Sequence, residues 1–99
     1  MFVLELTYTA PLDRVDALLK PHIDWLDGMY EEGVVIASGR KNPRDGGVLL
    51  AVGDDRAHVE RLAAGDPFVT GGVAEYRVTE FAATRTVPAL AAYREQPAS

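Results

Sequence analysis

The sequence predicts an α+β fold in which an antiparallel sheet carries helices on one of its faces. Two patterns support this prediction. Residues 2–9 alternate between apolar and more polar residues as strands do, whereas residues 11–33 and 54–64 carry apolar residues at helical spacing. Together with three further strand-like segments, these elements follow the order β-α-β-β-α-β, which is the ferredoxin-like arrangement.

The first helical region is the longest regular segment of the chain. It begins near Pro11, because proline is favoured in the first turn of a helix, and it ends at Gly33, a typical C-terminal glycine. Pro21 falls inside the pattern, and we expect it to kink the helix or to restart it near Lys20.

The remainder of the chain alternates between apolar strands, one helix and one tight turn. We expect these elements at residues 34–38, 48–52, 54–64, 66–67 and 73–81. The glycine-bearing segment 39–47 then joins the first two strands as a long hairpin connection. In the tail, Val87, Leu90 and Tyr93 recur at helical spacing, and this segment either packs on a partner or frays.

The length of the chain predicts its number of domains, and the sheet face that carries no helix predicts how copies associate. The 99 residues fit a single domain, which we expect to have its core in residues 1–81 and a tail in residues 82–99. A bare sheet face that carries Val3, Val35, Leu49 or their neighbours would be an exposed apolar patch, which soluble monomers avoid. We therefore expect a homodimer whose sheets meet face to face.

Composition and charge argue against several classes of function. The net charge is −5, from 10 basic and 15 acidic side chains, which opposes general nucleic-acid binding. With no membrane-spanning segment and no signal peptide in the sequence, we expect a cytoplasmic protein. Cysteine is absent, and His22 and His58 lack the carboxylate spacing of a metal site. No nucleotide, flavin or haem signature is found either, so we expect neither metal nor cofactor.

One residue stands out as a candidate for chemistry. His22 interrupts an otherwise apolar helical stripe over residues 15–29. Histidine is the side chain that titrates nearest neutral pH, and leaving it buried without a partner costs about 1–3 kcal/mol. His22 is therefore either a core or interface histidine bonded to a backbone carbonyl, or a general acid and base whose other ring nitrogen is held by a carboxylate.

Several short motifs, taken in their order and spacing, resemble the YCII-related family. The motifs are Pro21-His22, Trp25-Leu26, Glu32-Gly33, Gly39, Asp66-Pro67-Phe68-Val69, Gly71-Gly72-Val73 and Tyr76. The resemblance covers most of residues 1–81 and implies a dimeric ferredoxin-like α+β barrel. It also implies that His22 and Asp66 form an active-site pair, in a family whose biochemical role is largely unassigned. The chain differs from many relatives at Arg40, where they carry a proline.

Asp66 has two candidate roles. An aspartate directly before Pro67 is typical of a helix N-cap, which is worth about 0.5–2 kcal/mol. As the partner of His22, the same carboxylate would orient the imidazole ring and stabilise its charged form. The two roles are not exclusive.

Three further residues are candidates for substrate binding. Arg40 lies with two other cations in segment 39–47, where it either faces an anionic substrate or lies in solvent. Trp25 and Tyr8 either line a pocket with His22 or pack in the core or at a dimer interface.

The leading hypothesis is a small cytosolic enzyme that uses His22 and Asp66 for proton transfer on a small anionic or aromatic metabolite. Isomerisation, elimination and decarboxylation-like reactions fit best, because each needs only a proton shuttle and no cofactor. One alternative is a non-catalytic ligand-binding or regulatory module of the same fold, with His22 as a binding or pH-sensing group. Another is a structural dimer with the histidine in a dry core.

Overall fold

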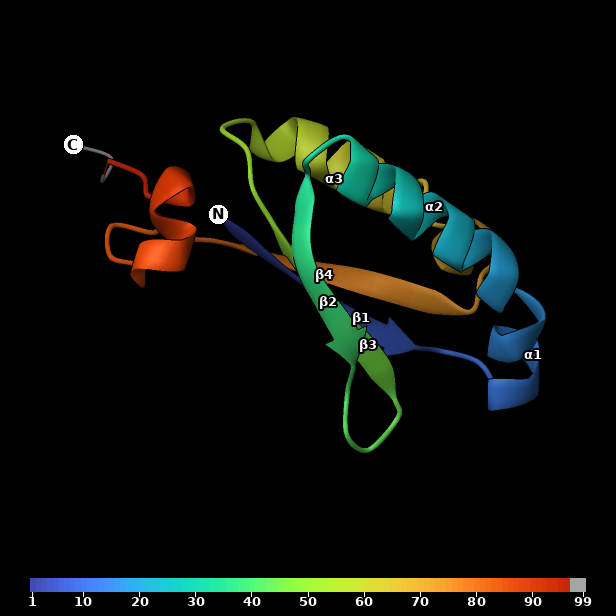
Figure 1. The fold of residues 1–99 in the computed structure, drawn as a ribbon. Helices are drawn as coiled ribbons and strands as arrows, with labels where there is room; N and C mark the ends of the chain where they lie inside the picture. The colour runs from blue at the N-terminus through green and yellow to red at the C-terminus, as the bar shows by residue number, and fades with distance from the viewer. Residues whose placement is uncertain (97–99) are drawn as a thin grey trace.

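The fold consists of one antiparallel sheet with helices packed on one of its faces (Figure 1). The computed structural model describes residues 1–96. The elements are β1 (Phe2–Tyr8), α1 (Leu12–Ala17), α2 (Leu19–Glu31), β2 (Val35–Arg40), β3 (Gly46–Ala51), α3 (Arg56–Ala64), α4 (Pro67–Thr70), β4 (Ala74–Glu80) and the 3-10 helix η1 (Pro88–Tyr93). The strand order is β2-β3-β1-β4 with antiparallel neighbours, so the ferredoxin-like prediction is confirmed.

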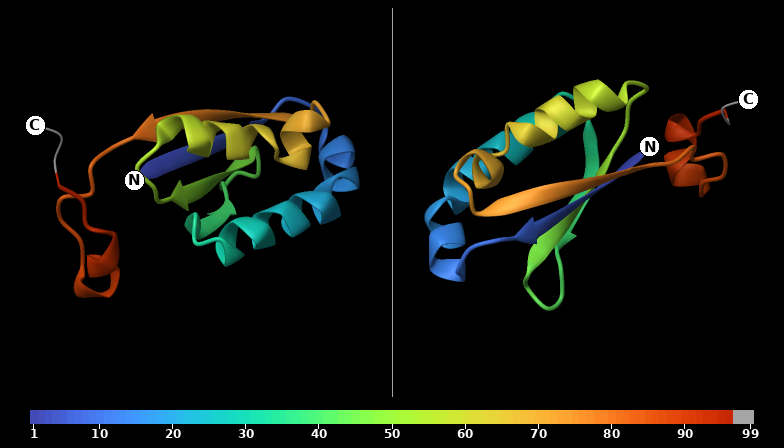
Figure 2. Two further views of the ribbon diagram at one scale, coloured as in Figure 1. Left: turned by 90° about the horizontal axis from the view of Figure 1, so that it is seen from above. Right: turned by 180° about the vertical axis from the view of Figure 1, so that it is seen from behind.

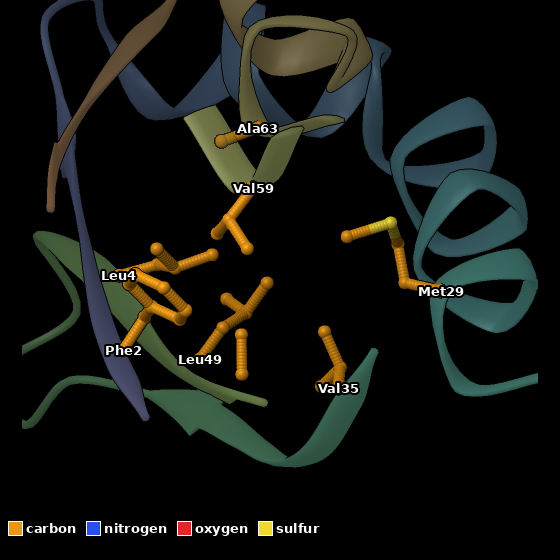
Figure 3. Close-up of a cluster of buried hydrophobic side chains, with 8 residues drawn as sticks. Phe2, Leu4, Met29, Val35, Leu49, Val59 and Ala63 are labelled. Atoms are coloured by element: carbon orange, nitrogen blue, oxygen red, sulfur yellow. The ribbon is translucent and has the colours of Figure 1, made fainter. Parts of the chain in front are cut away.

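Helices α2 and α3 lie on the same side of the sheet, which leaves the other face without a helix (Figure 2). The larger apolar cluster fills the space between this sheet and both helices (Figure 3). Its members are Phe2, Leu4, Met29, Val35, Leu49, Ala51, Val59 and Ala63. A second cluster lies towards α1 and α4 and includes Leu6, Val15 and Phe68. The candidate site is built against this second cluster.

The first helical region is two helices and not one kinked helix. Leu18 separates them with φ −106° and ψ 6°, and α2 restarts at Leu19. Pro21 therefore falls in the first turn of α2, where its missing N–H leaves no intrahelical hydrogen bond unmade. The helix ends just before Gly33, which has φ +74°, a conformation that favours glycine.

Two residues predicted on the bare face lie on the opposite side of the sheet. Val35 and Leu49 are buried beneath the helices. Leu49 pairs with Leu4 of β1, and directly opposed cross-strand partners share one face. Val3 does lie on the bare face as predicted, and the other apolar residues there are Ala37, Val48 and Leu50.

The hairpin between β2 and β3 is tighter than predicted. β2 extends to Arg40 and β3 begins at Gly46, so the connection spans residues 41–45 and not 39–47. A Cβ atom on Gly46 would lie 1.8 Å from the backbone oxygen of Leu6 in β1. This position of β3 therefore requires glycine, because any side chain would prevent the close approach of the two backbones.

The tail forms the 3-10 helix η1 beyond the end of the sheet, and none of the residues of η1 is buried (Figure 1). Two hydrogen bonds between Ala83 and Glu95 close this segment on itself. Packing of the tail on a partner remains a prediction. Within residues 1–96, no helix has the length and apolar character needed to cross a membrane.

Replacing Gly46 by alanine is expected to destabilise the protein by at least about 1–3 kcal/mol, because the new methyl group meets backbone atoms of β1. Gly39→Ala is the matched control, since nothing lies within 4 Å of the Cβ position there. Its effect should stay within about 0.5 kcal/mol. Urea denaturation measures both values, and equal stability of the two variants would contradict the close approach.

Candidate active site

The site is formed where α2 meets the start of α4. His22 is the fourth residue of α2, and its backbone N–H is bonded to Leu18 at 3.1 Å. Asp66 is the N-cap of α4. Nδ1 of His22 lies 2.8 Å from Oδ1 of Asp66, so two residues 44 positions apart share a direct hydrogen bond. His22 is 9% exposed and Asp66 is 0% exposed.

The Asp66 carboxylate makes both of the contacts that its candidate roles require. Its Oδ1 accepts the capping hydrogen bond from the backbone N–H of Phe68 at 2.9 Å while it also lies next to the His22 ring. Its Oδ2 accepts a hydrogen bond from the hydroxyl of Tyr76 at 2.6 Å. One carboxylate offers about four lone-pair sites, so these three donors do not compete. They replace water around a charge that has no exposure to solvent.

Tyr76 is the member of this group that the sequence analysis did not assign to the site. Tyr76 pairs with Leu6 across β1 and β4, so its side chain shares the face that the helices cover. Burial raises the pKa of Tyr76 above its usual value, and the negative charge of Asp66 raises it further. The phenol therefore stays protonated and acts as a donor to Asp66. Alternation in β4 indicated an inward side chain, but nothing in the sequence indicated its partner.

Aromatic rings hold the imidazole in place. The ring of Phe68 stacks on that of His22 with centroids 3.9 Å apart and planes 6° apart. Trp25 flanks the imidazole at 5.9 Å. Because the Asp66 carboxylate accepts from Nδ1, the neutral ring carries its proton there and leaves Nε2 as the free acceptor. In the part of the chain that the structure describes, no side chain is bonded to Nε2.

A cavity of about 170 Å³ opens beside His22, between α2 and strands β1, β2 and β3. Its wall is mostly apolar, with leucine, isoleucine and phenylalanine side chains. The polar side chains that line it are Tyr8, His22, Ser38 and Arg40. Trp25 does not line it, and packs instead against the larger core cluster. Of the three residues considered for substrate binding, the structure thus brings Tyr8 and Arg40 to the cavity.

The three cations of the predicted loop have different surroundings. Lys41 lies 3.8 Å from Glu5, and Arg44 is bonded to Asp16 at 2.5 Å. Arg40, at the end of edge strand β2, makes no ion pair with any of residues 1–96. Of the three cations, Arg40 is thus the one that lines the cavity without an ion-pair partner among the described residues.

The cavity also has a hydroxyl group that the sequence did not point to. Oγ of Ser38 is 2.6 Å from the hydroxyl of Tyr30 on α2. No cluster of three or more histidine, cysteine, aspartate or glutamate residues suited to a metal ion occurs among the described residues.

The raised pKa of Tyr76 predicts a pH dependence of stability. The folded protein holds the phenol proton more tightly than the unfolded chain, whose tyrosines titrate near pH 10. Stability should therefore fall as pH rises above about 10, by up to about 1.36 kcal/mol per pH unit from this group. Urea denaturation in this range should show a shallower decline for Tyr76→Phe than for the wild type. Tyr93→Phe, which alters an exposed tyrosine, should keep the wild-type slope.

Comparisons with known proteins agree with this architecture. The sequence profile of the YCII-related domain family matches residues 1–82 of this chain. None of the curated proteins matches the chain. Among solved structures, the chain is similar to 5-chloro-2-hydroxyhydroquinone dehydrochlorinase from Burkholderia phenoliruptrix, solved in complex with 2,5-dihydroxybenzoquinone. The TM-score is 0.62 at 17% identity, over 82% of this chain and 93% of that one, which supports the fold. Because the family match spans most of its length, this chain belongs to the YCII-related domain family.

Proposed function

We propose that this chain is a small cytoplasmic enzyme that transfers a proton with His22 and Asp66, without a cofactor, in a lyase-type or isomerase-type reaction. The observation that carries the proposal is the hydrogen bond from Nδ1 of His22 to a buried carboxylate, in a residue that lines a cavity and whose Nε2 has no side-chain partner among residues 1–96. A neutral imidazole in this tautomer accepts a proton at Nε2, and Asp66 stabilises the imidazolium that forms.

The shape of the cavity favours a small aromatic substrate. An apolar cavity of about 150 Å³ accommodates one benzene ring, and the cavity beside His22 has about 170 Å³ with mostly apolar walls. Arg40 supplies a positive charge at one side, which suits a carboxylate or a phenolate. The bound quinone in the similar dehydrochlorinase structure is a single ring with hydroxyl groups, which supports the same class of ligand here.

An elimination illustrates the proposed chemistry. The step starts from the keto tautomer of the ring, in which the carbon that bears the leaving group is tetrahedral, and Nε2 of His22 accepts a proton from a hydroxyl or a C–H group of this tautomer. The electron pair of that bond forms a new double bond, and a leaving group such as chloride departs with its own bonding pair. Arg40 stabilises the negative charge that develops on the ring oxygens, and the imidazolium then returns its proton to water. The substrate loses one proton and one leaving group, which together are HCl when the leaving group is chloride, so no oxidant or reductant is needed.

Replacing His22 by alanine should abolish turnover while the protein stays folded. With a chlorinated hydroxyhydroquinone as substrate, chloride release should fall by about 10²–10⁴-fold, which is the usual contribution of a general base. His58→Ala is the matched control, because His58 is exposed on α3, and it should release chloride at the wild-type rate. Retained chloride release in His22→Ala would disprove the proton transfer.

Replacing Arg40 by glutamine should weaken binding of an anionic ring. One charge-assisted hydrogen bond contributes about 1.5–3 kcal/mol, and for this exposed side chain we expect the lower value, about a ten-fold rise in Kd. Calorimetric titration with 2,5-dihydroxybenzoquinone measures this change. Arg61→Gln, on the exposed surface of α3, should bind as the wild type does. An unchanged Kd in Arg40→Gln would show that Arg40 does not contribute to binding of the ring.

The alternative function is a ligand-binding module with the same cavity. The small volume of the cavity and the fixed imidazole are compatible with recognition alone. Tight binding of 2,5-dihydroxybenzoquinone without turnover of any chlorinated or isomerisable relative would favour this alternative.

We also propose that two copies associate through the bare sheet face. The apolar group of Val3, Ala37, Val48 and Leu50 lies on this face, and Val48 is 38% exposed. Burying such a patch against a second copy is the simplest way to remove it from water.

Sedimentation of the variant Val48→Lys tests this association. The new cation lies opposite Glu5 on β1, so the protomer should stay folded while the apolar contact is lost. We expect a dimer for the wild type and a monomer for Val48→Lys. Leu12→Lys, which alters an exposed leucine of α1 away from both the bare face and the tail, should remain dimeric. A monomeric wild-type protein would contradict the proposal.

A further inference from the structure

We propose that Tyr76 is a positioning residue that keeps the proton of His22 on Nδ1 by anchoring the far oxygen of the Asp66 carboxylate. This inference deepens the proposed function, since it names the group that sets the protonation state of the base. It rests on a contact made on the side of Asp66 that faces away from His22.

The two oxygens of Asp66 have different tasks. Oδ1 receives both the capping N–H of Phe68 and the imidazole, whereas Oδ2 receives only the Tyr76 hydroxyl among residues 1–96. Without that hydroxyl, Oδ2 would be an unpartnered atom in a residue with no exposure. The carboxyl group would relieve this by rotating, or by sharing the imidazole proton. Either change loosens the hold on Nδ1–H.

Helix capping alone does not require this arrangement. Asp55, the N-cap of α3, accepts from the backbone N–H groups of Ala57 and His58 through Oδ1, and it is exposed. Among residues 1–96, no side chain donates a hydrogen bond to its carboxylate. Asp66 caps α4 in the same way through one oxygen, so the additional buried donor on Oδ2 serves the bond to His22.

Tyrosine at position 76 is well suited to hold a fixed carboxylate. Its ring is placed by the strand register opposite Leu6 and is flanked by Trp25 at 6.4 Å. Phenylalanine would fill the same apolar space without bringing a hydroxyl group into it. Because burial and the charge of Asp66 raise the pKa of Tyr76 above its usual value, the phenol remains a donor to Oδ2 at neutral pH.

The imidazole nitrogens of His22 report directly on this role. Nitrogen-15 NMR of the labelled full chain distinguishes the two neutral tautomers, and His58 serves as an internal reference. In the wild type we expect His22 with its proton on Nδ1. In Tyr76→Phe, the ratio of the Nε2–H to the Nδ1–H tautomer should rise about five-fold, which corresponds to the loss of one ordinary hydrogen bond. The variant Asp66→Asn gives the tautomer ratio of a His22 ring that has no carboxylate partner, against which the ratio in Tyr76→Phe is compared.

The control variant is Tyr93→Phe, which removes an exposed hydroxyl and should leave the His22 signals unchanged. Circular dichroism shows whether each variant is folded. A folded Tyr76→Phe with the wild-type tautomer ratio would overturn the inference. If Tyr76→Phe does not fold, the wild type provides the test, since the inference requires a hydrogen-bonded Tyr76 hydroxyl proton in its NMR spectrum. Absence of that signal would overturn the inference.

The tautomer measurement uses no substrate, so it is independent of the activity assay. A changed tautomer with no turnover in the wild type would support the positioning role and reject the enzyme. An unchanged tautomer together with an inactive His22→Ala would support the enzyme and reject the role of Tyr76.

Discussion

The buried carboxylate of Asp66 is the group on which the candidate site depends. It collects one donor from α2, one from α4 and one from β4, so it joins three elements that are far apart in the chain. A charge with no exposure is tolerated only where donors replace its water shell. The same bonds therefore cap a helix, connect that helix to its neighbours and hold the imidazole ring. The helix cap and the contact with the imidazole share one carboxylate, so a substitution of Asp66 alters both.

The cavity has two kinds of wall. Helix α2 and the sheet beneath it supply apolar side chains, whereas the end of edge strand β2 supplies Arg40 and Ser38. Their placement follows from pairing with β3, in which Arg40 is opposite Gly47 and Ser38 is opposite the buried Leu49. Gly47 also lines the cavity and adds no side chain to it. A ligand would thus meet an apolar surface on one side and a cation on the other.

Most of the fold could be predicted because its signals are local. Alternation in β1, the prolines and Gly33 around α2, and the Asp66-Pro67 cap are each read within a few residues. Which face Val35 and Leu49 occupy could not be read, since their strands begin with continuous apolar runs that lack alternation. Gly46 and Gly47 were interpreted as loop residues because a close backbone approach has no signal in the sequence itself. The contact of His22 with Asp66 was expected only from the family resemblance, and Tyr76 could not be assigned because register across β1 decides it.

Three successive residues at the start of α4 perform three tasks: Asp66 binds the imidazole, Pro67 begins the helix and Phe68 stacks beneath the ring. The reactive group is thus supported from a segment that contributes one residue, Phe68, to the wall of the cavity. Substitutions on α2, β2 and β3 can reshape that wall without moving the support. In the proposed function, the residues that hold the imidazole and most of the residues that would select a ligand therefore lie on different segments of the chain.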